Sequence, residues 1–217
     1  MKEASGVVIA IDGPAGAGKS TLGRRLATEL GLAFVNTGAM YRALTAEALR
    51  RGIDVDDALA LADLARNLRF DIDDSVAPPA LAVNGKPPGD ELSKPEVEAS
   101  VSAVSRHPEV RRVMAKEQRR LGMQGAVIEG RDIGTVVFPD AEVKIFLEAP
   151  PSIRATRRVR ERGGGASLAE ALAERDAKDA KVNPLVPASD AERIDTSGRT
   201  ADEVFGEARD IVRRRLR

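Results

Sequence analysis

Residues 13–20 (GPAGAGKS), followed by Thr21, match the pattern G-x-x-x-x-G-K-[ST] that binds the phosphates of nucleoside triphosphates. The glycines let successive backbone N–H groups point at one anion, and the helix that begins there adds the positive end of its dipole. In such loops the lysine reaches the β- and γ-phosphates, and the hydroxyl ligates Mg²⁺. We therefore expect Lys19 at the phosphates and Ser20 as a metal ligand. The predicted triphosphate-binding residues are Gly13, Pro14, Ala15, Gly16, Ala17, Gly18, Lys19, Ser20 and Thr21.

Two further segments carry arginines just after predicted strands. Residues 36–42 (NTGAMYR) follow one strand, and residues 129–135 (EGRDIGT) follow another. Open α/β sheets bind ligands at the carboxyl ends of their strands. Phosphoryl transfer between two polyanions depends on positioning and charge neutralisation, so arginines from separate segments should converge there. The alternative is that each segment is a helix cap with a solvated arginine.

The elements that must position these motifs alternate between strands and helices. Short β-branched runs predict the strands, and apolar residues at helical spacing, such as Leu22, Leu26 and Leu30, predict the helices. The alternation predicts an α/β fold of the P-loop NTP-binding type, with a parallel sheet covered by helices on both faces. The predicted strands span residues 7–12, 32–35, 126–129, 143–147 and 193–196. The predicted helices span residues 19–30, 37–51, 58–67, 109–121, 152–162, 167–181 and 201–216.

Residues 68–89 interrupt this alternation. They contain two short extended pieces and the hairpin dipeptide Asn84-Gly85, which together predict a small antiparallel insertion. Ser93 is then expected to begin a helix, with Glu96 as its capping-box partner. Pro108 should interrupt that helix before it resumes.

The composition excludes several classes of chemistry. The 217 residues contain no Cys and one His, which excludes thiolate catalysis and both Cys-based and His-rich metal sites. The 34 basic residues balance the 34 acidic ones and aromatic residues make up 3%, so neither nucleic acid nor a membrane is an expected partner. No apolar run approaches the roughly 20 residues that span a bilayer, and the apolar start of the chain is read as a strand. We expect a cytoplasmic protein.

A phosphate-binding loop alone is compatible with a GTPase, a motor ATPase or a small-molecule kinase. The guanine-recognition motif Asn-Lys-x-Asp is absent from the sequence, and the size and charge of the chain favour a kinase for a small phosphate-bearing acceptor. Among enzymes, the alternative is a kinase for another small anionic acceptor. From another class, the alternative is a nucleotide-gated module that binds nucleic acid.

Together with residues 143–147 (VKIFL), 175–179 (RDAKD) and 184–191 (PLVPASDA), these motifs resemble those of bacterial cytidylate kinases, a family of nucleoside monophosphate kinases. The resemblance covers essentially the whole chain, and the contiguous run at residues 130–141 (GRDIGTVVFPDA) is highly specific. It implies phosphoryl transfer from ATP to CMP or dCMP with Mg²⁺. It also implies that the enzyme is cytoplasmic, is usually a monomer and acts on small-molecule nucleotides.

The resemblance implies a single kinase unit with three parts. The core comprises residues 1–37, 122–150 and 183–217, approximately. An enlarged acceptor-binding part covers about 38–121, and a short lid covers about 151–182.

The resemblance also assigns residues to the acceptor nucleotide. Thr37, Arg42 and Arg131 fall where the family holds the acceptor monophosphate and its sugar. Arg175 and Asp179 match an R-x-x-x-D pair that engages phosphates and sugar hydroxyls. Their spacing of four residues equally suits an ordinary helical ion pair.

Ser102, Arg111 and Asp132 fall where the family recognises cytosine. A carboxylate can accept from the exocyclic amine of the base, while Ser and Arg donate to its ring acceptors. Uracil would present its O4 acceptor to the acceptor Asp132, and an unpaired buried polar group makes such rejection strong. Without the resemblance, Ser102 and Arg111 are read as part of a solvated helix face.

The basic helix predicted at residues 152–162 resembles the lid of such kinases. It would close over the triphosphate, neutralise charge and exclude water. The alternative is a solvated helix face. Arg157 is the lid residue expected to act in catalysis, together with Lys19 and Arg131. The arginines of this helix are Arg154, Arg157, Arg158, Arg160 and Arg162.

The sequence departs from the family pattern at a few positions. Relatives often carry an arginine where this chain has Val182, and Lys181 is the candidate replacement. Asn36 stands where many relatives carry Asp, and Glu129 where some do. Glu129 either orients Mg²⁺-bound water or only ends its strand.

Overall fold

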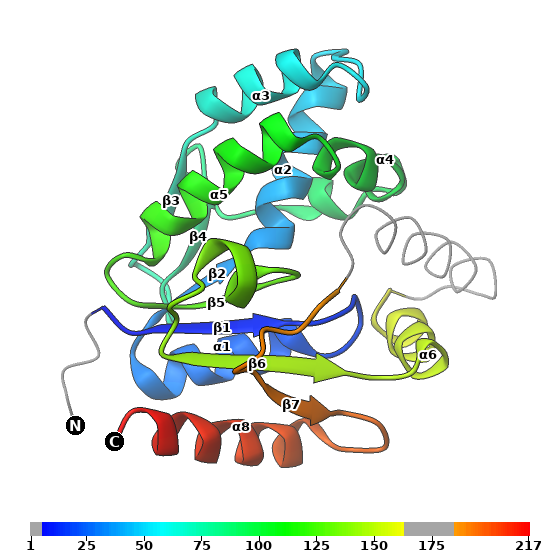
Figure 1. Cartoon of the computed structure of the whole chain (residues 1–217). Coiled ribbons are helices and arrows are strands. Elements are labelled where there is room, and N and C mark those ends of the chain that lie inside the picture. Colours follow the sequence, from blue (N-terminus) through cyan, green and yellow to red (C-terminus); the bar gives the residue numbers. More distant parts are fainter. Residues whose placement is uncertain (1–5, 163–184) are drawn as a thin grey trace.

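The computed structural model describes residues 6–162 and 185–217, apart from the side chains of residues 158 and 160–162 (Figure 1). The strands are β1 (Val8–Asp12), β2 (Ala33–Asn36), β3 (Phe70–Asp73), β4 (Ala80–Val83), β5 (Ala126–Gly130), β6 (Val143–Glu148) and β7 (Glu192–Asp195). The helices are α1 (Lys19–Leu30), α2 (Thr37–Arg50), α3 (Ala58–Asn67), α4 (Pro95–Ser105), α5 (Pro108–Gly122), α6 (Pro151–Arg162) and α8 (Ala201–Arg215). Two short helical turns are η1 (Asp90–Ser93) and η2 (Ile133–Val137).

The described strands form one sheet in the order β3-β4-β2-β5-β1-β6-β7. Neighbouring strands are parallel except for the antiparallel pair β3 and β4. The carboxyl ends of the parallel strands therefore meet at one edge, where Asp12 lies opposite Gly130 and Asn36 lies opposite Glu129. This is the edge at which the sequence predicts the ligands.

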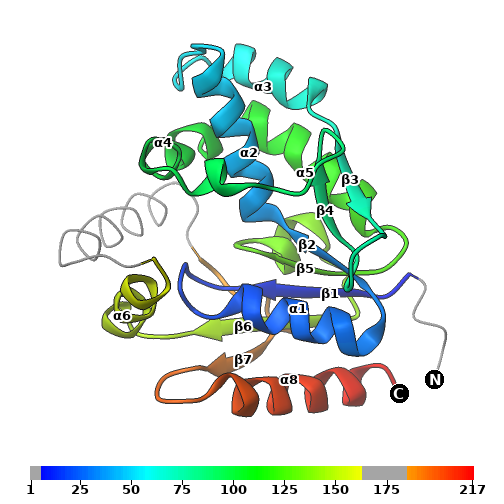
Figure 2. The same ribbon diagram turned by 180° about the vertical axis from the view of Figure 1, so that it is seen from behind.

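Helices cover both faces of the sheet, as the sequence predicts. Successive residues of a strand point to opposite faces, so the fully apolar start of β1 supplies two cores. Val8 and Ala10 pack in a core with residues of α2, α3, α4 and α5. Ile9 and Ile11 pack in a second core with residues of α1 and α8. Figure 2 shows the two helical layers from behind, with the sheet between them.

Most helix boundaries follow from residue chemistry. Gly31 ends α1 in the left-handed conformation with φ 65°, and the Asp57 carboxylate accepts hydrogen bonds from the first N–H groups of α3. Thr200 and Glu203 form a capping box at the start of α8. Among the described residues, no helix combines the length and the hydropathy that a membrane span requires.

The predicted hairpin region forms an antiparallel pair, β3 with β4, but it is not a separate insertion. β4 also pairs in parallel with β2, so the two strands extend the main sheet. Asn84 and Gly85 do form a two-residue turn, with φ values of 51° and 76°. This turn joins Val83 to Lys86 after β4, whereas the link between β3 and β4 lies earlier, in residues 74–79.

The helix start predicted at Ser93 is wrong. Residues 90–93 form the short turn η1, and α4 begins at Pro95 with Lys94 at its cap and no side-chain cap. Proline has a fixed φ and no N–H, so it favours the first helical turn over an interior position. The interruption predicted at Pro108 is confirmed, since α4 ends at Ser105 and Pro108 begins α5 through the same preference. The turn η2 after β5 was not predicted from the sequence.

Candidate active site

The predicted phosphate-binding loop leaves β1 and curls into the start of α1. Gly13 has a φ of 143°, and a Cβ atom there would lie 2.4 Å from the backbone oxygen of Leu147 in β6. Gly16 has a φ of 78°, and a Cβ atom there would lie 3.0 Å from the backbone oxygen of Arg154 in α6. Both positions therefore require glycine, because the loop backbone packs directly against its neighbours.

Lys19 lies across this loop. Its Nζ donates a hydrogen bond to the Pro14 carbonyl at 2.8 Å. Gly18, the cap of α1, has a φ of 97° and no side chain to accept from the first N–H groups of the helix. The Lys19 ammonium group and the uncapped N–H groups at the start of α1 therefore lie at the same loop. Such an arrangement favours the binding of an anion.

Ser20, the predicted metal ligand, is joined to Glu129 at the end of β5. The Ser20 hydroxyl donates to Glu129 Oε1 at 2.7 Å. Glu129 is buried, and its Oε2 is a buried oxygen with no hydrogen-bond partner. Burial raises the pKa of Glu129, while the nearby charges of Lys19 and Arg42 lower it.

These residues fit a divalent cation. Hydroxyl and carboxylate oxygens are the ligands that Mg²⁺ prefers, and it usually keeps several waters while binding few protein groups. The unpartnered Oε2 of Glu129 beside Ser20 supplies an acceptor for such a cation or its water. Among the described residues, no group of three or more acidic or His side chains forms a site made of protein alone.

The residues predicted for the acceptor phosphate lie at the start of α2 and after β5. Thr37 is 4% exposed, and its hydroxyl donates to the Glu129 carbonyl at 2.7 Å, so it ties the start of α2 to the end of β5. The Arg42 guanidinium lies over Gly38, where a Cβ atom would be 3.2 Å from Arg42 Nη1. Arg131 is half-buried and directly follows β5. All three thus lie near the carboxyl ends of the two central strands β2 and β5.

Two of the three residues predicted to recognise the base form an ion pair. Arg111 Nη2 of α5 donates to Asp132 Oδ2 at 2.5 Å, with the side chains 28% and 19% exposed. Tyr41 of α2 hydrogen-bonds Gln118. Burial raises the pKa of Tyr41 to about 12, and the charges of Arg111 and Asp132 act on it in opposite directions. The third predicted residue, Ser102, lies half-buried in α4, the helix that precedes α5.

Arg157, the predicted lid residue, binds the loop that follows β7. Its guanidinium donates to the Thr196 carbonyl at 2.6 Å and to the Thr196 hydroxyl at 2.9 Å. The same side chain lies 3.5 Å from the Gly16 carbonyl. Arg154, which is buried, donates to the Ala15 carbonyl at 3.2 Å. The first turns of α6 therefore contact the phosphate-binding loop itself.

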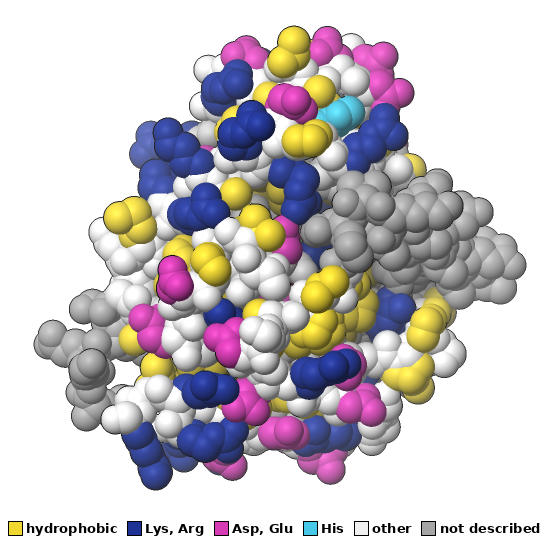
Figure 3. Space-filling view, viewed as in Figure 1, with side chains coloured by type: hydrophobic (Ala, Val, Ile, Leu, Met, Phe, Trp, Pro, Cys, Tyr) yellow, Lys and Arg dark blue, Asp and Glu magenta, His cyan; other side chains and the backbone are white. Residues whose placement is uncertain are grey.

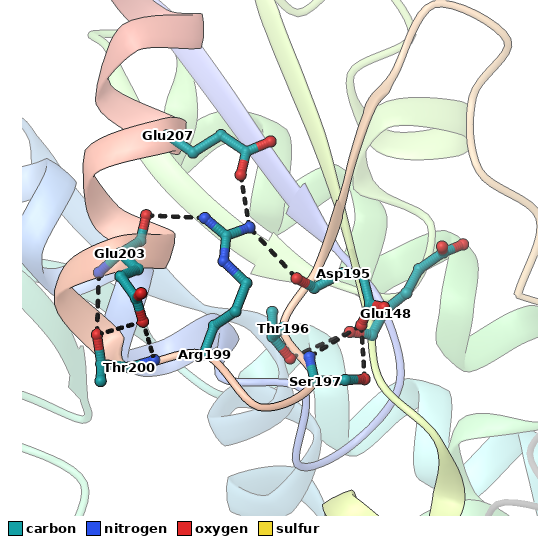
Figure 4. Close-up of polar contacts among 8 residues, drawn as sticks. All are labelled: Glu148, Asp195, Thr196, Ser197, Arg199, Thr200, Glu203 and Glu207. Carbon is teal, nitrogen blue, oxygen red and sulfur yellow. Dashed lines mark hydrogen bonds and ion pairs between the residues drawn. The ribbon is translucent and has the colours of Figure 1, made fainter.

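Figure 4 shows how the loop carrying Thr196 is built. The Thr196 hydroxyl contacts the Glu148 carbonyl at 3.1 Å, which joins the loop to the end of β6. Ser197 N and Oγ both donate to Asp195 Oδ1, and Arg199 pairs with Glu207 of α8. These contacts fix the backbone that Arg157 binds.

Several predicted residues lie outside the described part of the chain. They are Arg175, Asp179, Lys181, Val182 and the helix expected at residues 167–181. The side chains of Arg158, Arg160 and Arg162 are also not described.

Two residues that no sequence motif indicated, Asp12 and Thr196, also lie at this edge. Asp12 ends β1, and its carboxylate accepts hydrogen bonds from the N–H groups of Ile133 and Gly134. A carboxylate at the end of an otherwise apolar strand is the signal that points to it. Thr196 lies in a short loop whose sequence carries no comparable signal.

A mostly parallel sheet with a glycine loop between β1 and α1, and arginines gathered at the strand ends, defines a P-loop kinase. An uncharacterized protein from Eubacterium ventriosum ATCC 27560 has a similar fold, with a TM-score of 0.50 and 12% identity over 95% of this chain and 98% of that chain. The cytidylate kinase family model matches residues 9–214, and the chain belongs to that family.

Relatives of two lengths resemble the chain. The cytidylate kinase of Limosilactobacillus reuteri (strain DSM 20016) is 40% identical over 96% of each chain, and that of Pelotomaculum thermopropionicum is 44% identical over 90% of this chain and 91% of that protein. The bifunctional pantoate ligase/cytidylate kinase of Trichormus variabilis is 43% identical over 96% of this chain, which spans only 42% of that longer protein.

Proposed function

We propose that the protein transfers the γ-phosphoryl group of ATP to CMP or dCMP, giving ADP and CDP or dCDP. The observation that carries this proposal is the placement of two different sites on one edge of the sheet. The phosphate-binding loop follows β1, and the Arg111–Asp132 pair is anchored just after the adjacent strand β5. One site suits a triphosphate and the other suits a polar base, as a nucleoside monophosphate kinase requires.

In this proposal the loop at residues 13–20 binds the ATP phosphates, and Thr21 extends this site into α1. Its backbone N–H groups and the uncapped start of α1 face the anion, and Lys19 exchanges the Pro14 carbonyl for phosphate oxygens. Arg157 lies beside Gly16 of this loop and would bind the same phosphates. Arg42 and Arg131 neutralise the acceptor phosphate from the other side.

Asp132 accepts a hydrogen bond from the exocyclic amine of cytosine, and Arg111 donates to a ring acceptor. The Arg111 guanidinium and the Asp132 carboxylate also neutralise each other's charge. The ion pair therefore presents a hydrogen-bond donor beside a hydrogen-bond acceptor. Ser102 of α4 supplies a further donor. Uracil would place an acceptor opposite the Asp132 carboxylate, and the enzyme should discriminate against it.

The transfer itself is a displacement in line. An oxygen of the acceptor phosphate forms a bond to the γ-phosphorus as the bond from that phosphorus to the bridging β,γ-oxygen breaks, and ADP leaves with the electron pair. Lys19, Arg131 and Arg157 stabilise the charge spread over the transferring group. Mg²⁺, when bound with ATP, neutralises the β- and γ-phosphate oxygens, and Ser20 with Glu129 would hold it.

We also propose that the chain has three functional parts and that the enzyme acts in the cytoplasm. The core at about 1–37, 122–150 and 183–217 binds ATP, the part at about 38–121 binds the acceptor, and a lid at about 151–182 closes when both nucleotides are present. Arg175 and Asp179 of the lid would engage phosphates and sugar hydroxyls. The enzyme is proposed to be a cytoplasmic monomer.

A coupled assay of ADP release across free monophosphates tests this function. We expect CMP and dCMP to be turned over with Mg²⁺ and ATP far better than UMP or AMP. Faster turnover of UMP or AMP would favour a kinase for a different acceptor and contradict the base assignment.

The rival outcome is an affinity for RNA or DNA that weakens steeply with salt and little phosphoryl transfer. Basic and acidic side chains are interspersed over the lower part of the face in Figure 3, which supports the kinase over a nucleic-acid module. The basic end of α8 is part of this pattern, because Arg213 pairs with Glu29, and Arg214 and Arg215 pair with Glu192.

A further inference from the structure

Asp12, the last residue of β1, holds a turn that lies more than a hundred residues further along the chain. Its side chain is buried, with the residue 8% exposed. Oδ1 accepts the N–H of Ile133 at 2.8 Å, and Oδ2 accepts the N–H of Gly134 at 2.7 Å. Both carboxylate oxygens are therefore used, one on each of two successive N–H groups.

Those two N–H groups belong to the first residues of η2, immediately after Asp132. A carboxylate just before a helical turn commonly folds back to accept such N–H groups. Asp132 does not do so, since η2 has no side-chain cap from that position, and its carboxylate pairs with Arg111 instead. Asp12 thus satisfies the N–H groups that would otherwise compete for the Asp132 side chain.

The Lys144 side chain also packs against this turn. A Cβ atom on Gly134 would lie 3.2 Å from the Lys144 side chain and 3.4 Å from Asp12 Oδ2. Lys144 is itself buried, and Asp190 accepts from its Nζ at 2.9 Å. The backbone at Gly134 is therefore packed against two charged side chains that come from the neighbouring strands β1 and β6.

A carboxylate is costly at this position, and the fold nevertheless keeps one. Burial raises the pKa of Asp12 to about 6, the Asp132 charge adds to this effect, and the Lys19 charge opposes it. The two N–H donors lower the pKa, which is the physical sign that they stabilise the ionised form. In an amide of the same shape, one of these two acceptor oxygens is replaced by an NH₂ group, which is a donor and cannot accept the N–H that faces it.

We infer that Asp12 is a positioning residue for the acceptor base: by binding the N–H groups of Ile133 and Gly134 it fixes the turn that presents Asp132 to Arg111 and to cytosine. The identity of the substrate in this inference rests on the proposed function. The positioning of the turn rests on the two hydrogen bonds of Asp12 alone. Asp12 also links the two sites, because the residue after it begins the phosphate-binding loop.

The test is Asp12→Asn, compared with Glu142→Gln. Glu142 is a matched control because its carboxylate also accepts a distant backbone N–H, that of Val8 at 2.8 Å, but at the opposite end of β1. We expect Asp12→Asn to raise the KM for CMP about tenfold and to lower the preference for CMP over UMP, from the loss of one charge-assisted hydrogen bond. The KM for ATP should change less than about twofold, and Glu142→Gln should change neither KM.

Faster amide hydrogen exchange at Ile133 and Gly134 in Asp12→Asn is the expected readout without substrate. Unchanged exchange, an unchanged CMP preference, or equal increases in the two KM values would overturn the inference. If Asp12→Asn does not fold, Gly134→Ala crowds the same turn from outside β1, because its Cβ atom would lie 3.2 Å from the Lys144 side chain. Faster exchange at Ile133 in this variant should accompany a lower CMP preference, and faster exchange with an unchanged preference overturns the inference equally. Failure of the wild-type enzyme to use CMP would instead contradict the proposed function, and the exchange measurement separates the two.

Discussion

Asp132 carries the sharpest prediction for a single residue, because it is assigned to one substrate only. In Asp132→Ala the Arg111 guanidinium loses its carboxylate partner and cytosine loses the acceptor for its amine. We expect kcat/KM for CMP to fall by about 10- to 100-fold, as for a hydrogen bond to a charged group, with little change in the KM for ATP. Steady-state kinetics with each nucleotide varied in turn measure both.

Asp56→Ala is the control for this variant. Asp56 also pairs with an arginine at 2.5 Å, Arg106, but these two side chains are 45% (Arg106) and 67% (Asp56) exposed. Such exposed pairs contribute little, so its kinetics should match those of the wild type. Equal losses of CMP and ATP binding in Asp132→Ala would contradict the role given to it.

Glu129 gives a second prediction at the scale of single residues. Its unpartnered Oε2 beside Ser20 fits a cation or its water, so Glu129→Gln should weaken the use of Mg²⁺. We expect the Mg²⁺ concentration for half-maximal activity to rise about tenfold, the usual size of an outer-ligand effect. Glu192→Gln, which alters a strand carboxylate paired with Arg214 and Arg215, is the control. An unchanged Mg²⁺ dependence would assign Glu129 only to the end of its strand.

Among the helices and strands, the sequence predicts most accurately those whose ends are determined by local residue chemistry. The helices α1 and α3 begin and end as their glycines, caps and apolar spacing predict. The start of α4 was mispredicted because the Ser93 and Glu96 pattern competes with Pro95, whose fixed φ decides the first turn. The place of β4 beside β2 depends on pairing between distant segments, which no local pattern contains.

The capping box of α8 allows a test at the scale of an element. Thr200 Oγ1 accepts from Glu203 N, and Glu203 accepts from Thr200 N (Figure 4). Thr200→Ala should lower the free energy of unfolding by about 1 kcal/mol while kcat stays unchanged, because α8 packs on the core but supplies no proposed site residue. Urea denaturation measures the loss. A denaturation midpoint equal to that of the wild type would show that the cap adds nothing to stability.

The stability of the whole molecule should depend on pH through Asp12. Burial raises the pKa of Asp12 from its ordinary value of 3.8 to about 6, so between these pH values the folded state binds more protons than the unfolded state. Stability therefore falls as pH rises from about 4 to about 6, by on the order of 3 kcal/mol from this residue. The residues that face it electrostatically are Asp132, which raises the pKa, and Lys19, which lowers it.

The difference between wild type and Asp12→Asn isolates this contribution, since other carboxyls titrate in both proteins. The wild type should lose stability relative to the variant as pH rises through that range, and the difference should level off above it. Denaturant unfolding at several pH values measures the difference. A difference that is constant with pH would contradict the burial assigned to the Asp12 carboxylate.

At the scale of the whole molecule, the sequence predicts the phosphate-binding loop because the loop is one contiguous motif. It predicts the α/β architecture because strand and helix patterns alternate regularly along the chain. It predicts Arg111 and Asp132 only through family resemblance, because the two residues come from separate elements and share no local pattern. The bonds from Asp12 to Ile133 and Gly134, and from Arg157 to Thr196, required the structure. They join segments that only the tertiary fold brings together.

A crystal structure with CMP and a non-hydrolysable ATP analogue tests the central claim most directly. We expect the triphosphate within residues 13–20 and the cytosine ring hydrogen-bonded to Arg111 and Asp132, with the two phosphate groups facing each other between them. A pyrimidine bound away from Arg111 and Asp132, or a triphosphate bound outside the loop, would contradict it.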